Sequence, residues 1–216
     1  MNDDIIQKQD SITLRSKIIN FYKNNKIIIF IFIIILLIIV ISTVYLVESN
    51  KSKRIALADN YIEAKVYLAN NDKEKAKSIL EKIIFSNDST YSTLSLFLYL
   101  NENLTTDQEK LVDLFNHVLG NNKFEKEVKD LVIFKKALIQ SNFVNESKLL
   151  ETVNPIIKEE TIWKPHALLL VGDYYASNKE YLKAKEFYTR ILSLKNINKE
   201  LYTQARLQLI FIQNEK

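Results

Sequence analysis

The side chains that most often carry out catalysis are scarce in this chain of 216 residues. It has no cysteine, only two histidines, His117 and His166, and only two glycines, too few for a glycine-rich phosphate loop. No H-E-x-x-H zinc motif occurs, and the acidic pair Glu159 and Glu160 is typical of a solvated helix face. We therefore expect no enzymatic activity, no metal or cofactor and no small-molecule substrate.

Tyrosine and phenylalanine, by contrast, are abundant and recur at spacings that a helical repeat explains. When Leu168 is placed at position 4 of a helix-turn-helix unit of about 34 residues, Gly172 and Ala184 fall at positions 8 and 20. Tyr175 and Tyr188 then fall at positions 11 and 24. Small residues at 8 and 20 let two antiparallel helices approach closely, with the tyrosines packed beside them. This pattern resembles the tetratricopeptide repeat.

A second and weaker match precedes it, with Ala64, Tyr67 and Ala76 at positions 8, 11 and 20. Ala76 and Ala184 lie 108 residues apart, which is about three repeat lengths. Two further pairs, at residues 90–119 and 123–157, fit between them on helical periodicity alone. The prediction is a tetratricopeptide-like α-solenoid of about four helix pairs. A generic helical bundle is the alternative.

Helices are the only regular elements that the sequence indicates. Gly and Pro total four in the whole chain, and neither alternating apolar patterns nor Asn-Gly or Asp-Gly hairpin turns are found. Short polar clusters, about 14–20 residues apart, separate the apolar-periodic segments. These clusters are residues 70–72, 86–88, 101–103, 120–122, 142–145 and 196–198.

Several helix ends carry local signals of their own. Asp72, Asp88 and Thr106 each precede a helical run and can accept hydrogen bonds from its first backbone N–H groups. Gly120 follows a run that ends at Leu119, so it is expected to end that helix in the left-handed conformation. Pro165 suits the first turn of a helix.

One long apolar stretch stands apart from the repeats. Residues 27–47 are 21 consecutive uncharged side chains, nearly all Ile, Leu, Phe or Val. As a helix they reach about 30 Å, the thickness of the bilayer hydrocarbon. A cleaved signal peptide is disfavoured because its apolar region is shorter and ends at a small-residue cleavage site. A buried core helix is disfavoured because so small a domain cannot surround it. We predict a charged head (residues 1–26), a transmembrane helix (27–47) and a helical domain (48–216).

The charge is concentrated beside the span. Residues 1–54 hold eight basic and four acidic side chains, which accounts for the whole net charge of +4. The remaining 162 residues hold 22 of each, so they offer no basic face for nucleic acid. Five Lys or Arg lie within about 20 residues before the span and four after it, a slight preference for a cytoplasmic N-terminus. We therefore expect the helical domain to be translocated.

The resemblance to tetratricopeptide arrays also indicates a binding surface. In such arrays the first helix of each pair lines a concave groove through positions near 2, 5, 9 and 12. The corresponding residues are Ala58, Tyr61, Lys65 and Leu68 in the first unit, and His166, Leu169, Asp173 and Ala176 in the last. A groove of this mixed character suits an extended or helical peptide.

The complete layout of head, span and divergent helical repeats resembles the bacterial ancillary subunit of the SecYEG translocon. Residues 56–69 and 172–184 look like corresponding pieces of that family. The resemblance implies a single-pass inner-membrane protein with a periplasmic helical domain, whose partners are translocon subunits, periplasmic chaperones and exported clients. The chain departs from the family in being rich in Ile, Lys and Asn and poor in Ala and Gly, which leaves the small-residue matches weak.

Two functions are compatible with these features. The first is a membrane-anchored scaffold that binds proteins through a groove or a face of the solenoid. The second is a structural or envelope-assembly protein that associates with itself and has no client groove.

Overall fold

The computed structural model describes the backbone of residues 2–214 and the side chains of residues 19, 21, 22, 24–28 and 30–214. Every regular element in this part of the chain is an α-helix, as predicted. The helices are α1 (Asn2–Ala69), α2 (Lys73–Ile84), α3 (Ser89–Asn101), α4 (Gln108–Asn121), α5 (Lys126–Gln140), α6 (Glu146–Lys158), α7 (Lys164–Ser177), α8 (Tyr181–Leu192) and α9 (Lys199–Asn214).

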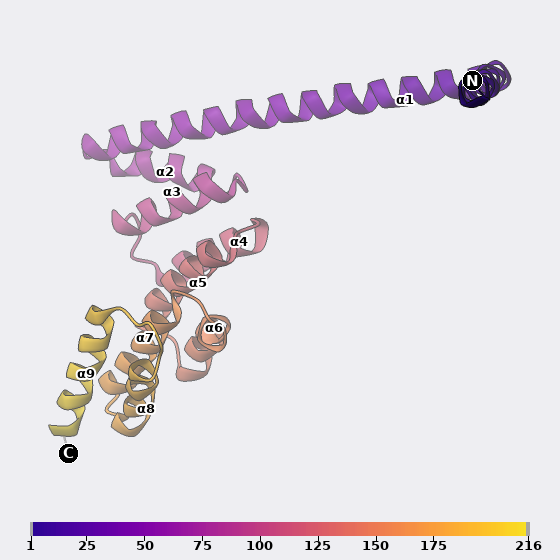
Figure 1. Cartoon of the computed structure of the whole chain (residues 1–216). Helices are drawn as coiled ribbons and strands as arrows, with labels where there is room; N and C mark the ends of the chain where they lie inside the picture. The colour runs from indigo at the N-terminus through magenta and orange to yellow at the C-terminus, as the bar shows by residue number, and fades with distance from the viewer. Residues whose placement is uncertain (1, 215–216) are drawn as a thin grey trace. The chain divides into compact units, whose positions relative to one another are not determined.

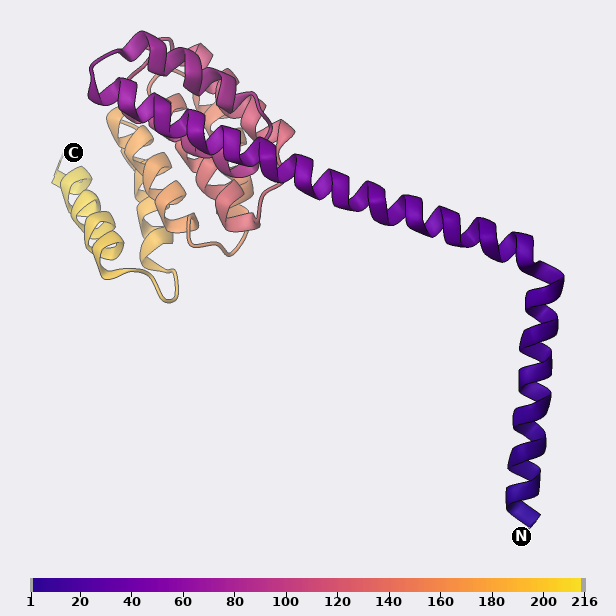
Figure 2. The same ribbon diagram turned by 90° about the horizontal axis from the view of Figure 1, so that it is seen from above.

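The chain forms two compact units, residues 1–56 and residues 57–216. The first unit is the greater part of α1, which bends at Asn25, where the backbone leaves helical geometry (φ −120°, ψ 17°), as Figure 2 shows. The Asn25 side-chain amide donates a hydrogen bond to the backbone carbonyl of Phe21 (3.0 Å). The predicted head is helical from Asn2 onward, and the side chains of residues 1–18, 20 and 23 lie outside the described residues.

Beyond the bend, α1 is long and apolar enough to cross a membrane. All the described side chains from residue 27 to residue 47 are exposed, and the most apolar window of the helix is not buried within the protein. Apolar surface of this extent is unfavourable in water and matches the hydrocarbon of a bilayer.

The second unit begins with the last turns of α1 and continues through α2 to α9, each helix packing against the next in chain order (Figure 1). The end of α1 shares a buried cluster with α2, and the pairs α3/α4 and α5/α6 fall where periodicity alone predicts them. The pair α7/α8 follows, and α9 packs on both of its members. This is the consecutive helix pairing of a solenoid.

Two clusters of buried apolar side chains form the core. One joins the end of α1 to α2, α3, α4 and Val132 on α5, and its largest fully buried members include Tyr99 and Phe115. The other joins α5 to α9 and contains Tyr188. Leu119 on α4 packs against both clusters, so the core is continuous along the solenoid.

Asparagine supplies most of the left-handed turns between helices. Asn71, Asn87, Asn103 and Asn196 have φ between 50° and 60°, and Lys179 has φ 61°. Asparagine tolerates this conformation better than other residues with a Cβ, and the chain has few glycines to use instead. The polar clusters that contain these asparagines therefore form turns because asparagine can adopt a positive φ there.

The helix-start signals are mostly confirmed. The Asp72 carboxylate accepts a hydrogen bond from the Lys75 N–H, Asp88 accepts from Thr90 and Tyr91, and Pro165 lies in the first turn of α7. Two expectations were wrong. The cap of α4 is Asp107, one residue after Thr106, and it accepts from the Lys110 N–H (3.0 Å). Gly120 lies inside α4 without a positive φ, and the helix ends at Asn121.

The two helices of the last pair approach each other closely at Gly172. A Cβ added there would lie 2.5 Å from Cε1 of the Tyr188 ring, which is closer than real Cβ contacts. The ring cannot move away easily, because Tyr188 is fully buried and its hydroxyl donates to Oδ1 of Asp173 (2.7 Å). Ala184 is also fully buried. The predicted packing at positions 8 and 20 is thus present in α7 and α8.

Buried tyrosines also connect three successive helices through their hydroxyl groups. Tyr99 on α3 donates to Oε1 of Glu81 on α2 (2.8 Å), and Lys110 on α4 forms an ion pair with the same oxygen (2.6 Å). Burial disfavours the charged form of the Glu81 carboxyl and by itself would raise its pKa. The hydrogen bonds from Lys110 and Tyr99 favour the charged form more strongly, so the pKa is lowered.

An equivalent arrangement occurs in the other half of the solenoid. Tyr175 on α7 donates to Oε1 of Glu146 on α6 (2.7 Å), and Lys183 on α8 pairs with Oε2 (2.9 Å). In both cases one carboxylate on an even-numbered helix accepts bonds from the two helices that follow it. The tyrosines therefore contribute polar contacts between repeats in addition to apolar burial.

The two glycines give opposite predictions when each is replaced by alanine. Gly172→Ala should lower the free energy of unfolding by about 1–3 kcal/mol, because the new Cβ overlaps a buried ring. Gly120→Ala should raise it by about 0.5–1 kcal/mol, because its site is helical and nothing lies within 4 Å of the added Cβ. Urea unfolding of the full chain in detergent, followed by far-UV circular dichroism, measures both; changes of the same sign would contradict this packing.

Candidate functional site

The odd-numbered helices α3, α5, α7 and α9 begin at the same edge of the solenoid. Short connections join successive helices, so neighbours run antiparallel and alternate helices run the same way. Two hollows open along this edge, and the connections that return the chain to it supply much of their lining. We refer to them as the α3–α5 hollow and the α5–α7–α9 hollow.

The α3–α5 hollow has a volume of about 480 Å³ and is mainly apolar. Its apolar wall combines the first turns of α3 with the start of α5 and the turn before it. Leu94 and Val128 are exposed there, beside the half-buried rings of Phe97 and Phe124. Thr93 contributes a small polar patch, although its hydroxyl donates to the Ser89 carbonyl within α3.

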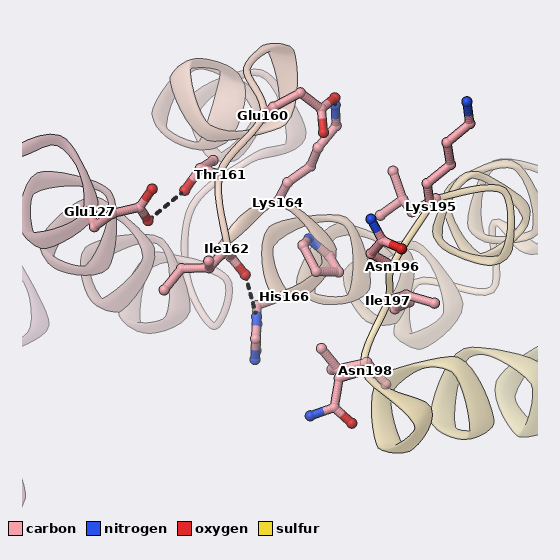
Figure 3. A pocket seen from close by; sticks show the side chains of 13 residues that line it. Glu127, Glu160, Thr161, Ile162, Lys164, His166, Lys195, Asn196, Ile197 and Asn198 are labelled. Atoms are coloured by element: carbon pink, nitrogen blue, oxygen red, sulfur yellow. Dashed lines mark hydrogen bonds and ion pairs between the residues drawn. The ribbon is translucent and has the colours of Figure 1, made fainter.

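The α5–α7–α9 hollow has a volume of about 530 Å³, and Figure 3 shows that its side chains come from several separate segments. Glu127 belongs to α5, Ile162 to the connection before α7, His166 to α7, and Ile197 to the connection before α9. Ile162 is 65% exposed, which is high for an aliphatic side chain in a folded domain.

Hydrogen bonds hold the wall of this hollow in place. The Thr161 hydroxyl donates to Oε2 of Glu127 (3.1 Å), and the indole N–H of Trp163 donates to the Glu127 backbone carbonyl (3.0 Å). The Nδ1–H of His166 donates to the Ile162 carbonyl (3.3 Å). These bonds tie the connection before α7 both to α5 and to α7, so Ile162 is presented on a fixed piece of backbone.

Three aromatic rings lie beside the α5–α7–α9 hollow. Phe134 stacks on Trp163 (centroids 5.8 Å apart, planes at 23°), and His166 contacts both rings at 5.9 and 5.3 Å. All three are only partly buried. Partly exposed aromatic rings on a rigid helical support are favourable contact surfaces for a peptide.

The charges around both hollows are balanced. Lys164 pairs with Glu160 at the α5–α7–α9 hollow, where Glu127 and Lys195 are also present, and Lys123 and Glu125 flank the other. Such a surface does not select a strongly acidic or basic partner. Among the described residues, no three His, Cys, Asp or Glu side chains are grouped so that they could hold a metal ion.

The structure separates the residues predicted to line a groove. His166 lines the α5–α7–α9 hollow. Leu169 is 8% exposed and belongs to the core, so its assignment to an open surface was wrong. Tyr61 and Leu68 pack against the N-terminal core cluster, and the Tyr61 ring contacts Tyr91 on α3 (6.4 Å).

The other predicted groove positions lie apart from the two hollows. Lys65 is exposed on α1, and Ala58 and Ala176 are half-buried. Asp173 is half-buried and accepts the hydrogen bond from Tyr188. None of these four residues lines the hollows described here, so the structure does not bring the two predicted halves of the groove together.

The predicted packing residues are placed more accurately. Ala64 and Ala76 are fully buried, as are their counterparts in the last pair. Tyr67 is the exception, because it is only half-buried and the Lys75 ammonium lies over its ring (5.2 Å). Fully buried Leu96 and Ala137 occupy comparable places on α3 and α5, which the sequence analysis did not assign.

The lining residues that the sequence analysis missed carry a recognisable signal. Ile162 follows the polar residues 159–161, and Ile197 stands between two asparagines. An apolar side chain within a polar connection has no helical face to bury it, so it lies at the surface or caps a neighbouring helix. The predicted turn at residues 196–198 therefore contains a residue that lines the hollow, Ile197.

Fold and site together define a class of protein: an all-α solenoid with a long apolar N-terminal helix and two shallow hollows at one edge. Comparison of the chain with known protein families, curated proteins and solved structures found no match.

Asp173 gives a prediction about pH. Burial raises the pKa of its carboxyl above the ordinary value of 3.8, and the bond from Tyr188 offsets this only partly. Between pH 3.8 and the higher folded pKa, the folded state binds more protons than the unfolded state, so stability falls as pH rises through that range. Asp173→Asn should therefore be more stable than the unchanged protein at pH 7, with a gain that shrinks as the pH approaches 4.

Urea unfolding of the full chain at pH 4, 5.5 and 7 tests this expectation. Asp113→Asn, at an exposed position on α4, is the matched control for removing one carboxylate. A loss of stability in Asp173→Asn that is equal at all three pH values would show that the carboxylate charge is not the cause.

Proposed function

We propose that this protein is a membrane-anchored scaffold that binds other proteins along the edge formed by the starts of the odd-numbered helices. The observation that carries the proposal is the pair of hollows there, with exposed Leu94, Val128 and Ile162 and the partly exposed rings of Phe134 and Trp163. Monomeric domains rarely keep such apolar groups together on the surface without a use for them.

The chemistry of this edge favours a particular kind of ligand. Both hollows are open and their charges are balanced; the α3–α5 hollow is mainly apolar, and the α5–α7–α9 hollow combines Ile162 and Ile197 with polar side chains. An extended or helical polypeptide segment with apolar or aromatic side chains at intervals would fill them in turn. Unfolded or partly folded chains expose such segments, whereas nucleic acid would require a net basic surface.

The cellular setting is proposed on the sequence resemblance and on the apolar helix. We propose a bacterial inner-membrane protein whose tetratricopeptide-like solenoid lies in the periplasm, beside the Sec translocon and periplasmic chaperones. Its clients would then be exported proteins. Tethering by α1 confines the solenoid to the membrane surface, which raises its effective concentration near membrane-bound partners.

Ile162 provides the most direct test of the binding edge. A photo-reactive amino acid at position 162 should crosslink, in intact cells, to translocon subunits, chaperones or exported proteins. Ile162→Ser should reduce recovery of the same partners about tenfold, because about 1–1.5 kcal/mol of apolar burial is lost on binding. Both changes affect an exposed side chain, so the fold should be unaffected.

Leu182 supplies the matched control for this experiment. It is a 77% exposed aliphatic residue on α8 and lines neither hollow. A photo-reactive residue at 182 should give few crosslinks, and Leu182→Ser should leave partner recovery unchanged. Equal crosslinking at the two positions would refute the proposed edge.

The membrane orientation has an independent test. A reporter enzyme that is active only in the cytoplasm, fused after Lys216, should be inactive if the solenoid is translocated. A reporter that is active only in the periplasm should give the opposite result at the same position. Activity of the cytoplasmic reporter would place the solenoid in the cytoplasm and would exclude periplasmic partners.

A further inference from the structure

The two ends of the solenoid carry exposed apolar stripes. At the first end, Ile62 and Val66 on the outer side of α1 are 60% and 53% exposed. At the last end, α9 buries Ala205 and Ile212 but leaves Leu207, Ile210 and Phe211 at 61%, 48% and 57% exposed. Residues three or four apart share a helix face, so each set forms one stripe.

Exposed stripes at these places are unusual for a solenoid. Each internal helix is covered on two sides by its neighbours, but the first and last helices lack one neighbour. Isolated solenoids usually solve this with terminal helices whose outer face is polar. Here both outer faces are apolar, so each lacks the neighbour that an internal helix has.

The charges beside the two stripes are opposite. Residues 57–69 of α1 carry Asp59, Glu63 and Lys65, a net charge of −1. Residues 199–214 of α9 carry Lys199, Glu200 and Arg206, a net charge of +1. All six side chains are exposed, and in the part of the chain that the structure describes none of them has an ion-pair partner. Unlike ends therefore attract each other, and like ends repel.

The arrangement around each helix also selects a direction. At 100° per residue, Asp59 and Glu63 lie on one flank of the α1 stripe, whereas Lys199 and Arg206 lie on the opposite flank of the α9 stripe. When two helices pack in parallel, opposite flanks meet, as at the e and g positions of a parallel coiled coil. Parallel packing of α9 on α1 thus brings the two acids to the two bases.

The remaining flanks agree with this direction. Lys65 lies on the second flank of α1, whereas Glu200 lies at the start of the α9 stripe itself, in line with Leu207 and Phe211. Antiparallel packing would set Lys65 against Lys199 and Arg206, whereas parallel packing keeps these three positive charges apart.

We propose that copies of this protein associate head to tail in the membrane, with α9 of one copy packing in parallel on α1 of the next. The site on α9 includes a shallow hollow of about 620 Å³ that extends from Lys199 past Thr203 to Leu207. The contact is heterologous, so it extends the stack of helices and forms rows rather than closed dimers. Each contact is small, and confinement to the membrane raises the concentration at which it acts. This inference does not depend on the proposed binding edge.

Crosslinking between introduced cysteines tests the head-to-tail contact. Because the chain has no natural cysteine, only the introduced thiols can react. Ile62→Cys and Thr203→Cys place one thiol on each outer face. In membranes, the full chain with both changes should give a ladder of dimers, trimers and larger species with a short bis-maleimide. A mixture of the two single variants should give dimers only, and each single variant alone should give none.

The outcomes separate the alternatives. A dimer formed by either single variant alone would show that like ends meet and would overturn the proposal. Absence of a ladder from the double variant would also overturn it, once a mono-maleimide dye has shown that both thiols react. Glu151→Cys with Lys185→Cys, on exposed sites of α6 and α8, gives the background from random collisions.

Charge reversal tests the direction of packing. Added to the double-cysteine chain, Glu63→Lys or Arg206→Glu alone should reduce the ladder several-fold. The two reversals together should restore it, because the complementary pair is re-formed with exchanged signs. Failure of this restoration would refute the proposed parallel pairing, and circular dichroism of each variant excludes a loss of fold.

Discussion

Each helix of the solenoid buries its apolar side only by packing against the helices beside it in the chain, and this constraint organises the whole second unit. Leu80 and Ile83 on α2, Phe115 on α4 and Tyr188 on α8 are all hidden in this way. A short helix is marginal by itself in water, so its stability comes from these neighbours. The Tyr99–Glu81–Lys110 contacts and their counterpart around Glu146 add polar links across three helices at a time.

The same alternation of direction creates the candidate site. Because odd-numbered helices begin at one edge, the connections before α5, α7 and α9 all return to it, and their residues cannot be covered by a further helix. Ile162 therefore lines a hollow at the surface, and Ile197 lines the same hollow while it packs against the edge of the core. Bonds from Thr161 and Trp163 to Glu127 keep that backbone in place, so the surface is rigid although it is built from connections.

The helices could be predicted from sequence because periodicity and turn residues are local properties. The pairing of the helices could also be predicted, because small residues such as Gly172 and Ala184 indicate where two helices pack closely. Of the predicted groove residues only His166 lines a hollow, because the groove positions come from a repeat register in which Leu169 points into the core. Hollows that arise from connections depend on how several segments meet, which no single periodicity encodes. The assignment to tetratricopeptide repeats, as opposed to another helical solenoid, is still a prediction.

Leu119 is a partly buried residue that packs against both halves of the core, and this has a consequence for how the protein unfolds. In a linear stack, loss of one half does not remove the internal contacts of the other. Opening of α5 to α9 would leave α2 to α4 held around Phe115 and Tyr99. The contact at Leu119 thus allows the solenoid to unfold in steps. A form in which one half is unfolded, and which is still attached to α1, is then the species that proteases and chaperones would meet first.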